Sequence, residues 1–284
     1  MNSFAKKFIG TKAFYMSVIA LLVPMVVQQG ITQFVSLLDN VMVGRLGTIP
    51  MSGVAIVNQV IFIFNLTVFG GMSGASIFGA QYYGKADIDG LRDTLRFRAW
   101  FALGASAIGI LALVLFGSTF LKLFLNPQVS DQNEIDTTLS LAKSYMDIML
   151  WGLVPFTFSV CISSVLRNAS ETFIPMVASV ISILVNLVLN YLLIFGSFGL
   201  PKMGVAGAAV ATVIARYVEL IYLIIQSVRH KKRFPFFIGV FKTLRVPLPL
   251  VKRIAITGTP LMLNETLWSM STSLVQVCYA SRGL

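Results

Sequence analysis

The sequence predicts an all-α, polytopic membrane protein, and three observations lead to that prediction. Hydrophobic residues make up 56% of the 284 positions and charged residues only 12%, whereas soluble domains carry about a quarter charged residues. The mean hydropathy is +0.83. The charged residues fall in groups, which leaves seven long apolar runs. Each run can cross a hydrocarbon core of ~30 Å as a helix that rises ~1.5 Å per residue.

The seven runs define the expected helices in chain order. The first contains 26 uncharged residues between Lys12 and Asp39, and the second lies within the uncharged stretch from Leu46 to Gly84. The fourth carries Asp147 at its outer edge. The predicted spans cover about residues 14–44, 52–80, 99–121, 142–166, 172–197, 203–228 and 254–281.

The distribution of basic residues predicts the orientation in the membrane. Of the 22 Lys and Arg residues, sixteen lie in the N-terminal segment and in the loops after spans two, four and six, five lie in the other loops, and Arg216 lies inside span six. Cytoplasmic loops carry an excess of Lys and Arg. We therefore expect a multi-pass protein of the plasma membrane (the inner membrane of a bacterium) with a cytoplasmic N-terminus. The same bias accounts for the net charge of +11 without a nucleic-acid partner.

The segment 229–253 is expected to separate two domains. It is strongly basic, contains the apolar stretch FPFFIGVF, and is interpreted as a cytoplasmic connector along the membrane surface. It divides an N-terminal six-helix lobe (1–228) from the first helix of a second lobe (254–284). A weak repeat supports this division, since an offset of 236 residues aligns Pro24 with Pro260 and Leu38 with Leu274. Six spans separate the two copies, so both copies have the same orientation, as parallel structural repeats do.

Polar residues inside the spans are the candidate functional residues. Asp39 lies near the end of span one, and an ionisable residue inside a membrane is a functional candidate by default. Asn186 and Asn190 are four residues apart, which places both amides on one face of span five. Thr212 lies at a similar depth in span six. Together their oxygen atoms suit a hard monovalent cation, or a proton on Asp39, rather than a transition metal.

Each of these residues also has a structural interpretation. Asp39 could pair with Arg45 at the membrane interface. The two asparagines could form hydrogen bonds between helices as packing contacts. Thr212 could donate to its own backbone.

Three other residues and one pair of prolines complete the candidates. Arg216 and Glu219, three residues apart in span six, are expected to pair with each other as a structural feature. Glu265 lies near the middle of span seven and is a second functional candidate, with a role as partner for helices beyond this chain as the alternative. Pro24 and Pro260 remove helical hydrogen bonds and are predicted hinges, with a fixed kink as the alternative.

The sequence contains no catalytic motif. A glycine-rich phosphate-binding loop, a catalytic triad and an HExxH motif are all absent. Cys161 and Cys278 both fall in apolar runs, and His230 lies in a basic loop without ligand partners, so no metal-binding spacing exists. We therefore expect a protein that is not an enzyme and that has no cofactor, with Na⁺ at the group around Asp39 as the one metal ion considered.

Four segments resemble the multidrug and toxic compound extrusion (MATE) transporters of the NorM- and DinF-like type. They are LLVPMVVQQGITQFVSLLDNVMVGRLG, GGMSGASIFGAQYYGKAD, LRNASETFIPM and NLVLNYLLIFGSFGLPKMGVAGAAVATVIAR. The resemblance implies twelve helices in two six-helix lobes, around a cavity that opens alternately to the two faces of the bilayer. It implies export of organic cations and other amphipathic drugs in exchange for Na⁺ or H⁺, with the full-length protein a monomer.

By the same resemblance, the chain comprises the N-terminal lobe plus the first helix of the second lobe. We expect it to be a truncated form that does not transport alone. The family's N-lobe cation site uses an aspartate on helix one, an asparagine on helix five and a threonine on helix six, which match Asp39, Asn186 and Thr212. The next helix-five position is often aspartate in the family but is Asn190 here, which removes one negative charge. Glu265 occupies the place of a helix-seven carboxylate that contributes to coupling in some members.

Three alternatives stay open at this point. A lipid-linked oligosaccharide flippase of the wider superfamily would need several arginines facing a central cavity, and the sequence offers only Arg216 there. A membrane-embedded enzyme would need paired catalytic groups at one depth, and Asp39 has no such mate. The third alternative is a half-transporter without activity.

Overall fold

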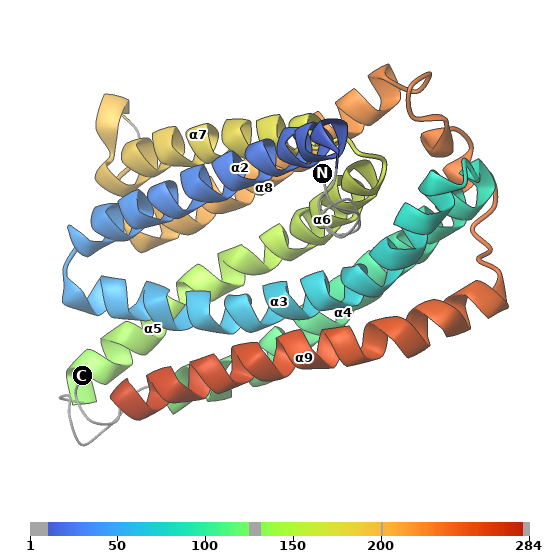
Figure 1. The fold of residues 1–284 in the computed structure, drawn as a ribbon. Helices are drawn as coiled ribbons and strands as arrows, with labels where there is room; N and C mark the ends of the chain where they lie inside the picture. The colour runs from blue at the N-terminus through green and yellow to red at the C-terminus, as the bar shows by residue number, and fades with distance from the viewer. Residues whose placement is uncertain (1–10, 125–131, 200, 281–284) are drawn as a thin grey trace, which may run out of the picture.

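The computed structural model describes residues 11–124, 132–199 and 201–280, and within these ranges the regular structure is helical throughout (Figure 1). The predicted fold class is therefore confirmed. Helices α5 and α6 follow each other directly through the 3₁₀ turn Leu150–Gly152. The helices are α2 (Lys12–Gly44), α3 (Thr48–Gly84), α4 (Ile88–Leu123), α5 (Gln132–Met149), α6 (Leu153–Asn168), α7 (Phe173–Phe195), α8 (Val205–Arg229) and α9 (Leu248–Ala280).

Six helices in the described part of the chain are long and apolar enough to cross a membrane. They correspond to the first six predicted spans, and the fourth consists of α5 and α6 together. α9 has 33 residues but is not among the six. The physical reason is its composition: hydroxyl and amide side chains surround Glu265 along its length, so α9 lacks a stretch as apolar as those of the six spans.

Side-chain and backbone caps fix where these helices begin and end. Side-chain oxygens of Thr11, Asp87 and Glu171 accept hydrogen bonds from first-turn N–H groups of α2, α4 and α7, at distances between 2.9 and 3.2 Å. Such caps satisfy N–H groups that have no partner inside the helix. α7 ends at Gly196, whose φ of 72° is left-handed and favours glycine.

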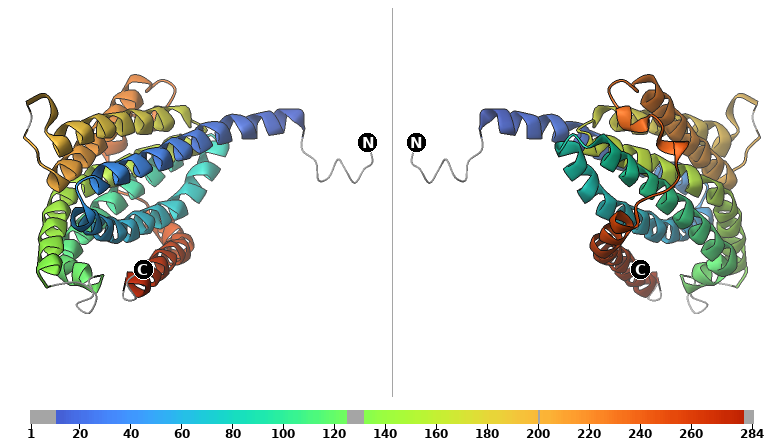
Figure 2. Two further views of the ribbon diagram at one scale, coloured as in Figure 1. Left: turned by 90° about the vertical axis from the view of Figure 1, so that its left-hand side faces the viewer. Right: turned by 90° about the vertical axis from the view of Figure 1, so that its right-hand side faces the viewer.

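The helices form two groups with α5 and α6 passing between them (Figure 1). One group contains α2, α7 and α8, and the other contains α3, α4 and α9. The first turns of α2 project beyond the other helices (Figure 2), and Phe14 and Met16 are exposed there. We call the end of the bundle that holds turns 85–87 and 169–172 the connector end. Residues 45–47, 196–199 and 201–204 lie at the far end.

Residues 230–247, between α8 and α9, form the connector. Phe234, Phe236 and Val240 are buried in a core cluster that includes residues of α4 and α6. The side chains of Arg96 and Trp100 on α4 donate to the carbonyls of Val240 (2.8 Å) and Leu244 (3.0 Å). The connector is thus anchored on the first six helices by apolar burial and hydrogen bonds. Residues 248–253, which the sequence analysis placed in the connector, are the first turns of α9.

Candidate functional site

Asp39 is held by a neighbouring helix near the far end of the bundle. Asn190 of α7 donates its Nδ2 to Oδ1 of Asp39 over 2.7 Å, and its side chain is almost fully buried. No ion pair joins Asp39 to the exposed Arg45 in the described structure, so the interface-anchor alternative is wrong. The carboxylate instead lies between α2 and α7.

Asn186 and Thr212 complete the group around Asp39. In one orientation the Asn186 amide accepts from Asn190 and donates to Thr212 Oγ1, both over 3.2 Å. After a half-turn, its nitrogen faces Asp39 Oδ2 at 3.0 Å and its oxygen accepts from the Thr212 hydroxyl at 3.2 Å. The second orientation places a donor on the carboxylate and an acceptor on the hydroxyl. The structure therefore brings together all four residues that the sequence analysis grouped.

A cavity of about 310 Å³ opens beside this group. Six further polar side chains line it that the sequence analysis did not assign to the site, namely Ser36 and Asn40 of α2, Asn58 and Asn65 of α3, Tyr145 of α5 and Arg216 of α8. The Tyr145 hydroxyl faces Asn58 Oδ1 at 3.4 Å. Asn58 and Asn65 are seven residues apart and so lie on one helical face, which is a signal that could have identified them.

Two amide oxygens at this cavity have no hydrogen-bond partner among the described residues. They are Oδ1 of Asn65 and Oδ1 of Asn190, and both are buried. A buried polar atom without a partner is uncommon, because desolvation costs free energy that a bond would recover. Together with the Asp39 carboxylate they offer oxygen ligands of the type that hard cations prefer. Across the described residues no group of three or more His, Cys, Asp or Glu could hold a metal ion.

Arg216 and Glu219 do not pair with each other, contrary to the prediction. Arg216 Nη1 donates to the carbonyl of Gly152 (3.2 Å), and its guanidinium lies over the Phe156 ring at 5.0 Å. Glu219 Oε1 accepts from Ser179 Oγ of α7 over 2.9 Å. The i, i+3 spacing permits an ion pair, but the two side chains have partners on different segments: Gly152 and Phe156 for Arg216, and Ser179 for Glu219.

The other predicted site residues lie elsewhere. Glu265 of α9 lies against Gly70 of α3, where its Cβ and Cγ are 3.2 Å from the position that a Cβ on Gly70 would take. It is not part of the cavity beside Asp39. Pro24 lies inside α2 and Pro260 inside α9, and each helix continues through its proline. Their roles as hinges stay predictions.

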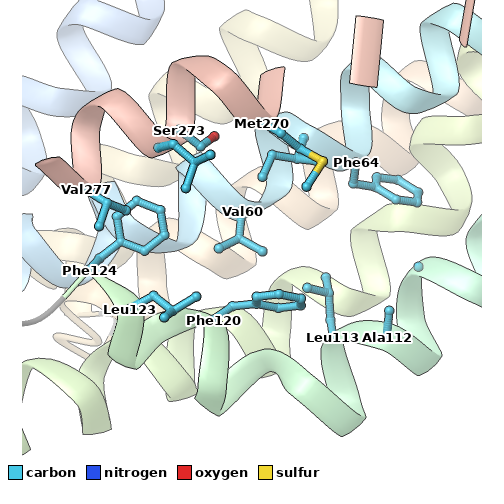
Figure 3. Close-up of a pocket in the computed structure, with 13 residues that line it drawn as sticks. Val60, Phe64, Ala112, Leu113, Phe120, Leu123, Phe124, Met270, Ser273 and Val277 are labelled. Atoms are coloured by element: carbon cyan, nitrogen blue, oxygen red, sulfur yellow. The ribbon is translucent and has the colours of Figure 1, made fainter. Parts of the chain in front are cut away.

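A second cavity, of about 300 Å³, lies between α3, α4 and α9 (Figure 3). Val60, Phe64, Leu113, Phe120 and Met270 point into it, and Ser273 is its only polar lining side chain. An apolar cavity of this kind suits the hydrocarbon part of a ligand and offers little orientation by hydrogen bonds. The polar cavity beside Asp39 and this apolar cavity are thus chemically opposite.

Comparisons with known proteins agree with these features. The model of the MatE family matches residues 24–192. A probable multidrug resistance protein NorM of Thermotoga maritima is 32% identical over 183 residues, which cover 63% of this chain and 37% of the relative. Its counterpart in Agrobacterium fabrum is 30% identical over 227 residues, 75% of this chain and 46% of that protein. The chain therefore spans less than half the length of these two relatives.

The fold has solved counterparts as well. The outward-facing conformation of a multidrug resistance MATE family transporter of the MOP superfamily superposes with a TM-score of 0.77 at 19% identity, covering 90% of this chain and 54% of that one. The inward-facing conformation of such a transporter gives a TM-score of 0.72 at 19% identity, covering 93% and 60%. At this identity the likeness shows the fold of half of a larger bundle.

Proposed function

Because the chain belongs to the MatE family and is a multi-pass membrane protein, we propose that it forms the first lobe of a secondary active multidrug antiporter. The complete protein would export organic cations and other amphipathic drugs in exchange for Na⁺ or H⁺. One observation carries the proposal: a carboxylate, Asp39, lies in a polar cavity beside two buried amide oxygens that lack hydrogen-bond partners.

The charge of the site favours one monovalent cation. Asp39 is the only acidic side chain among the residues that line the cavity. A proton on its carboxyl group, or a Na⁺ bound to its oxygens, would make Asp39 formally neutral. Na⁺ would also accept the unpaired oxygen of Asn190 as a ligand, since hard cations bind carboxylate and carbonyl oxygens.

The coupling step would act on the contact between α2 and α7. A cation on Asp39 competes with the amide of Asn190 for the carboxylate and so changes the strength of this contact. Pro24, fifteen residues earlier on α2, lacks the N–H of a normal helical hydrogen bond and lets the helix bend there. Two shapes of α2 that differ in drug affinity and in cation affinity are sufficient for exchange. Glu265 on α9 is the second coupling candidate.

The orientation and the assembly belong to the same proposal. The described basic residues concentrate at the connector end, where Arg92, Arg96, Arg229 and Lys231 lie, and this supports a cytoplasmic location for that end. The complete protein would be a monomer in the bacterial inner membrane, without a cofactor. A flippase is less well supported, because Arg216 is the only arginine that lines the cavity beside Asp39.

The experiment replaces Asp39 in the complete protein that contains this lobe. Asp39→Asn keeps the size of the side chain and removes its charge, so drug efflux from membrane vesicles driven by a Na⁺ or H⁺ gradient should be lost while expression is retained. Asp147→Asn is the matched control, since Asp147 is an exposed acid of another span outside the cavity and should leave efflux unchanged. Normal efflux by the Asp39→Asn variant would contradict the proposal.

A further inference from the structure

A second polar contact between the same helices lies closer to the connector end than Asp39. Gln28 of α2 donates its Nε2 to Ser179 Oγ of α7 over 2.6 Å. Ser179 Oγ in turn donates to Glu219 Oε1 of α8 over 2.9 Å. Three helices thus meet at one carboxylate, and the mechanism proposed above makes no use of it.

A polar face of α7 connects this contact with the group around Asp39. Ser179, Ser182, Asn186 and Asn190 follow one another at intervals of three, four and four residues, which keeps them on one side of the helix. Ser182 is buried and donates to the carbonyl of Ala215 over 2.9 Å. Asn190 follows Ser179 by eleven positions, which corresponds to ~16 Å along the helix axis.

The opposite face of α7 has a different composition. Leu184, Val188 and Tyr191 are each more than half exposed in the structure. Polar side chains are therefore confined to the side that α2 and α8 cover. We call this line of side chains, with Gln28 and Glu219, the polar seam.

A cavity of about 660 Å³ lies at the connector end, one helical turn from the polar seam. Pro24 of α2 and Tyr222 of α8 line it, and both lie one turn from seam residues, since Gln28 follows Pro24 by four positions and Glu219 precedes Tyr222 by three. The lining residues nearest the connector are polar: Glu171, Gln226, His230 and Arg233. Arg233 Nη2 and Glu171 Oε2 form an ion pair of 2.8 Å there.

Charged groups on α6 and on its own helix, α8, act on Glu219. Arg167 of α6 and Arg216 of α8 are the cations that interact with it electrostatically, and Ser179 is its hydrogen-bond donor on α7. α2 contributes the neutral Gln28 through Ser179. Glu171, His230 and Arg233 are the titratable and charged groups of the adjoining cavity.

We propose that the polar seam carries protons between Asp39 and the connector-end cavity, with Glu219 as the intermediate carrier. This rests on the proposed function, in which Asp39 binds the coupling cation, and it assigns H⁺ to this route. The O–H bond of protonated Asp39 breaks and an O–H bond forms on Glu219, through bridging water molecules and the hydroxyls of Ser182 and Ser179, each of which gives up one O–H bond as it forms another. The Asn186 amide does not carry the proton and would orient the water beside Asp39. Glu219 then gives the proton to water in the cavity, so one proton moves and no electron is transferred.

The first test measures water access to the polar seam. In the 284-residue chain in membranes, with Cys161 and Cys278 replaced by alanine, a single cysteine is placed at Ser179 or, as the control, at Val188. Val188 lies on the exposed apolar face of the same helix. A membrane-impermeant thiol reagent added on the connector side should modify Ser179→Cys on the order of tenfold faster than Val188→Cys, because the reactive thiolate needs a polar environment. Equal rates, or modification of Ser179→Cys only from the far side, would overturn the route.

The second test follows proton arrival at Asp39. In vesicles, a pH drop on the connector side should produce a carbonyl-stretch infrared band of protonated Asp39, identified by its loss in Asp39→Asn. Glu219→Gln should slow the appearance of this band about tenfold or more without changing its final amplitude, since it removes the carrier and keeps the hydrogen-bond acceptor. Glu219→Asp should restore part of the rate.

The outcomes separate this inference from the proposed function. An unchanged rate in Glu219→Gln, or a changed amplitude with an unchanged rate, overturns the seam as the proton route. Absence of the Asp39 band overturns it too, whereas Na⁺ binding that is lost in Asp39→Asn would still support the cation site of the proposed function. Modification of Ser179→Cys should be the same in Asp39→Asn, because the route exists whether or not Asp39 can be protonated.

Discussion

The contact between α2 and α7 and the contact between α3 and α9 join helices in different ways. α2 and α7 meet through side chains, with Asn190 on Asp39 and Gln28 on Ser179, and a cavity adjoins the first pair. α3 and α9 approach each other closely at glycines, and Gln59 Nε2 also donates to Ser273 Oγ between them over 2.7 Å. A Cβ on Gly74 would lie 2.4 Å from Gly258 Cα, and a Cβ on Gly70 would lie 2.7 Å from Met262 Cα.

The difference indicates which contact can respond to a cation. A charged hydrogen bond changes strength when its carboxylate is neutralised or binds a cation. Close backbone packing depends on shape and dispersion forces, and it has no charge to neutralise. We therefore expect the α2–α7 contact to depend on pH or Na⁺ through Asp39, and the close contact of Gly74 with Gly258 between α3 and α9 to be insensitive to both.

The largest effect on stability is expected for Asn190→Leu, which removes the donor to Asp39. A hydrogen bond to a charged group contributes about 1.5–3 kcal/mol, and the buried carboxylate would lose one. The free energy of unfolding in mixed micelles should fall by that amount. Any stabilisation by Na⁺ or by acid should shrink with it, because ligand binding stabilises only through an intact site.

Asn40→Leu is the control for Asn190→Leu. Asn40 lines the same cavity but is exposed, so Asn40→Leu should change the free energy of unfolding by less than about 0.5 kcal/mol. Equal losses in the two variants would show that the bond between Asn190 and Asp39 does not determine the α2–α7 contact.

Gly74→Ala, in the α3–α9 contact, is expected to have the next largest effect on stability. The new methyl group would meet the backbone of α9, which cannot move aside as a side chain can, and overpacking costs about 1–3 kcal/mol. Unfolding should become easier by that amount, while the stabilisation by Na⁺ or acid should keep its size. Loss of that stabilisation in Gly74→Ala would show that the two contacts are not independent.

Gly104→Ala on α4 is the matched control for Gly74→Ala. Nothing lies within 4 Å of the position that its Cβ would take. Alanine is favoured over glycine inside a helix by up to about 1 kcal/mol. The same substitution should therefore stabilise at position 104 and destabilise at position 74, and a measurement with one sign at both positions would contradict the close-packing account.

The sequence predicts depth along the helices better than neighbours around them. The rise per residue places Asp39, Asn190 and Thr212 at similar depths, and the structure brings them together. The predicted ion pair between Arg216 and Glu219 is wrong because it depends on neighbours around the helix. The spacing along α8 brings the two side chains near each other, but it does not reveal that Gly152 and Ser179, on other segments, are their hydrogen-bond partners.

Other features depend on contacts between distant segments. Asn58, Asn65 and Tyr145 join the cavity only because α3 and α5 pack beside α2 and α8. The composition of the connector predicted its existence but not its anchoring. Arg96 anchors it by donating to a backbone carbonyl, and because every residue has a backbone carbonyl, the sequence does not show which residue is the partner. Such backbone partners leave no signal in a single sequence, whereas long apolar runs leave a strong one.

The smallest effect is expected for the hydroxyl pair of the α3–α9 contact. The oxygen atoms of Thr67 and Thr266 are 3.0 Å apart. Each hydroxyl also faces a carbonyl of its own helix, that of Ile63 at 2.8 Å and that of Met262 at 2.7 Å. A hydroxyl has one hydrogen. When Thr67 and Thr266 each donate to a carbonyl of their own helix, neither has a hydrogen left to donate to the other. A double-mutant cycle with Thr67→Val and Thr266→Val should give a coupling energy no larger than the ~0.6 kcal/mol typical of hydrogen bonds between membrane helices. A coupling several times larger would mean that hydrogen bonding, and not glycine packing alone, holds α9 against α3.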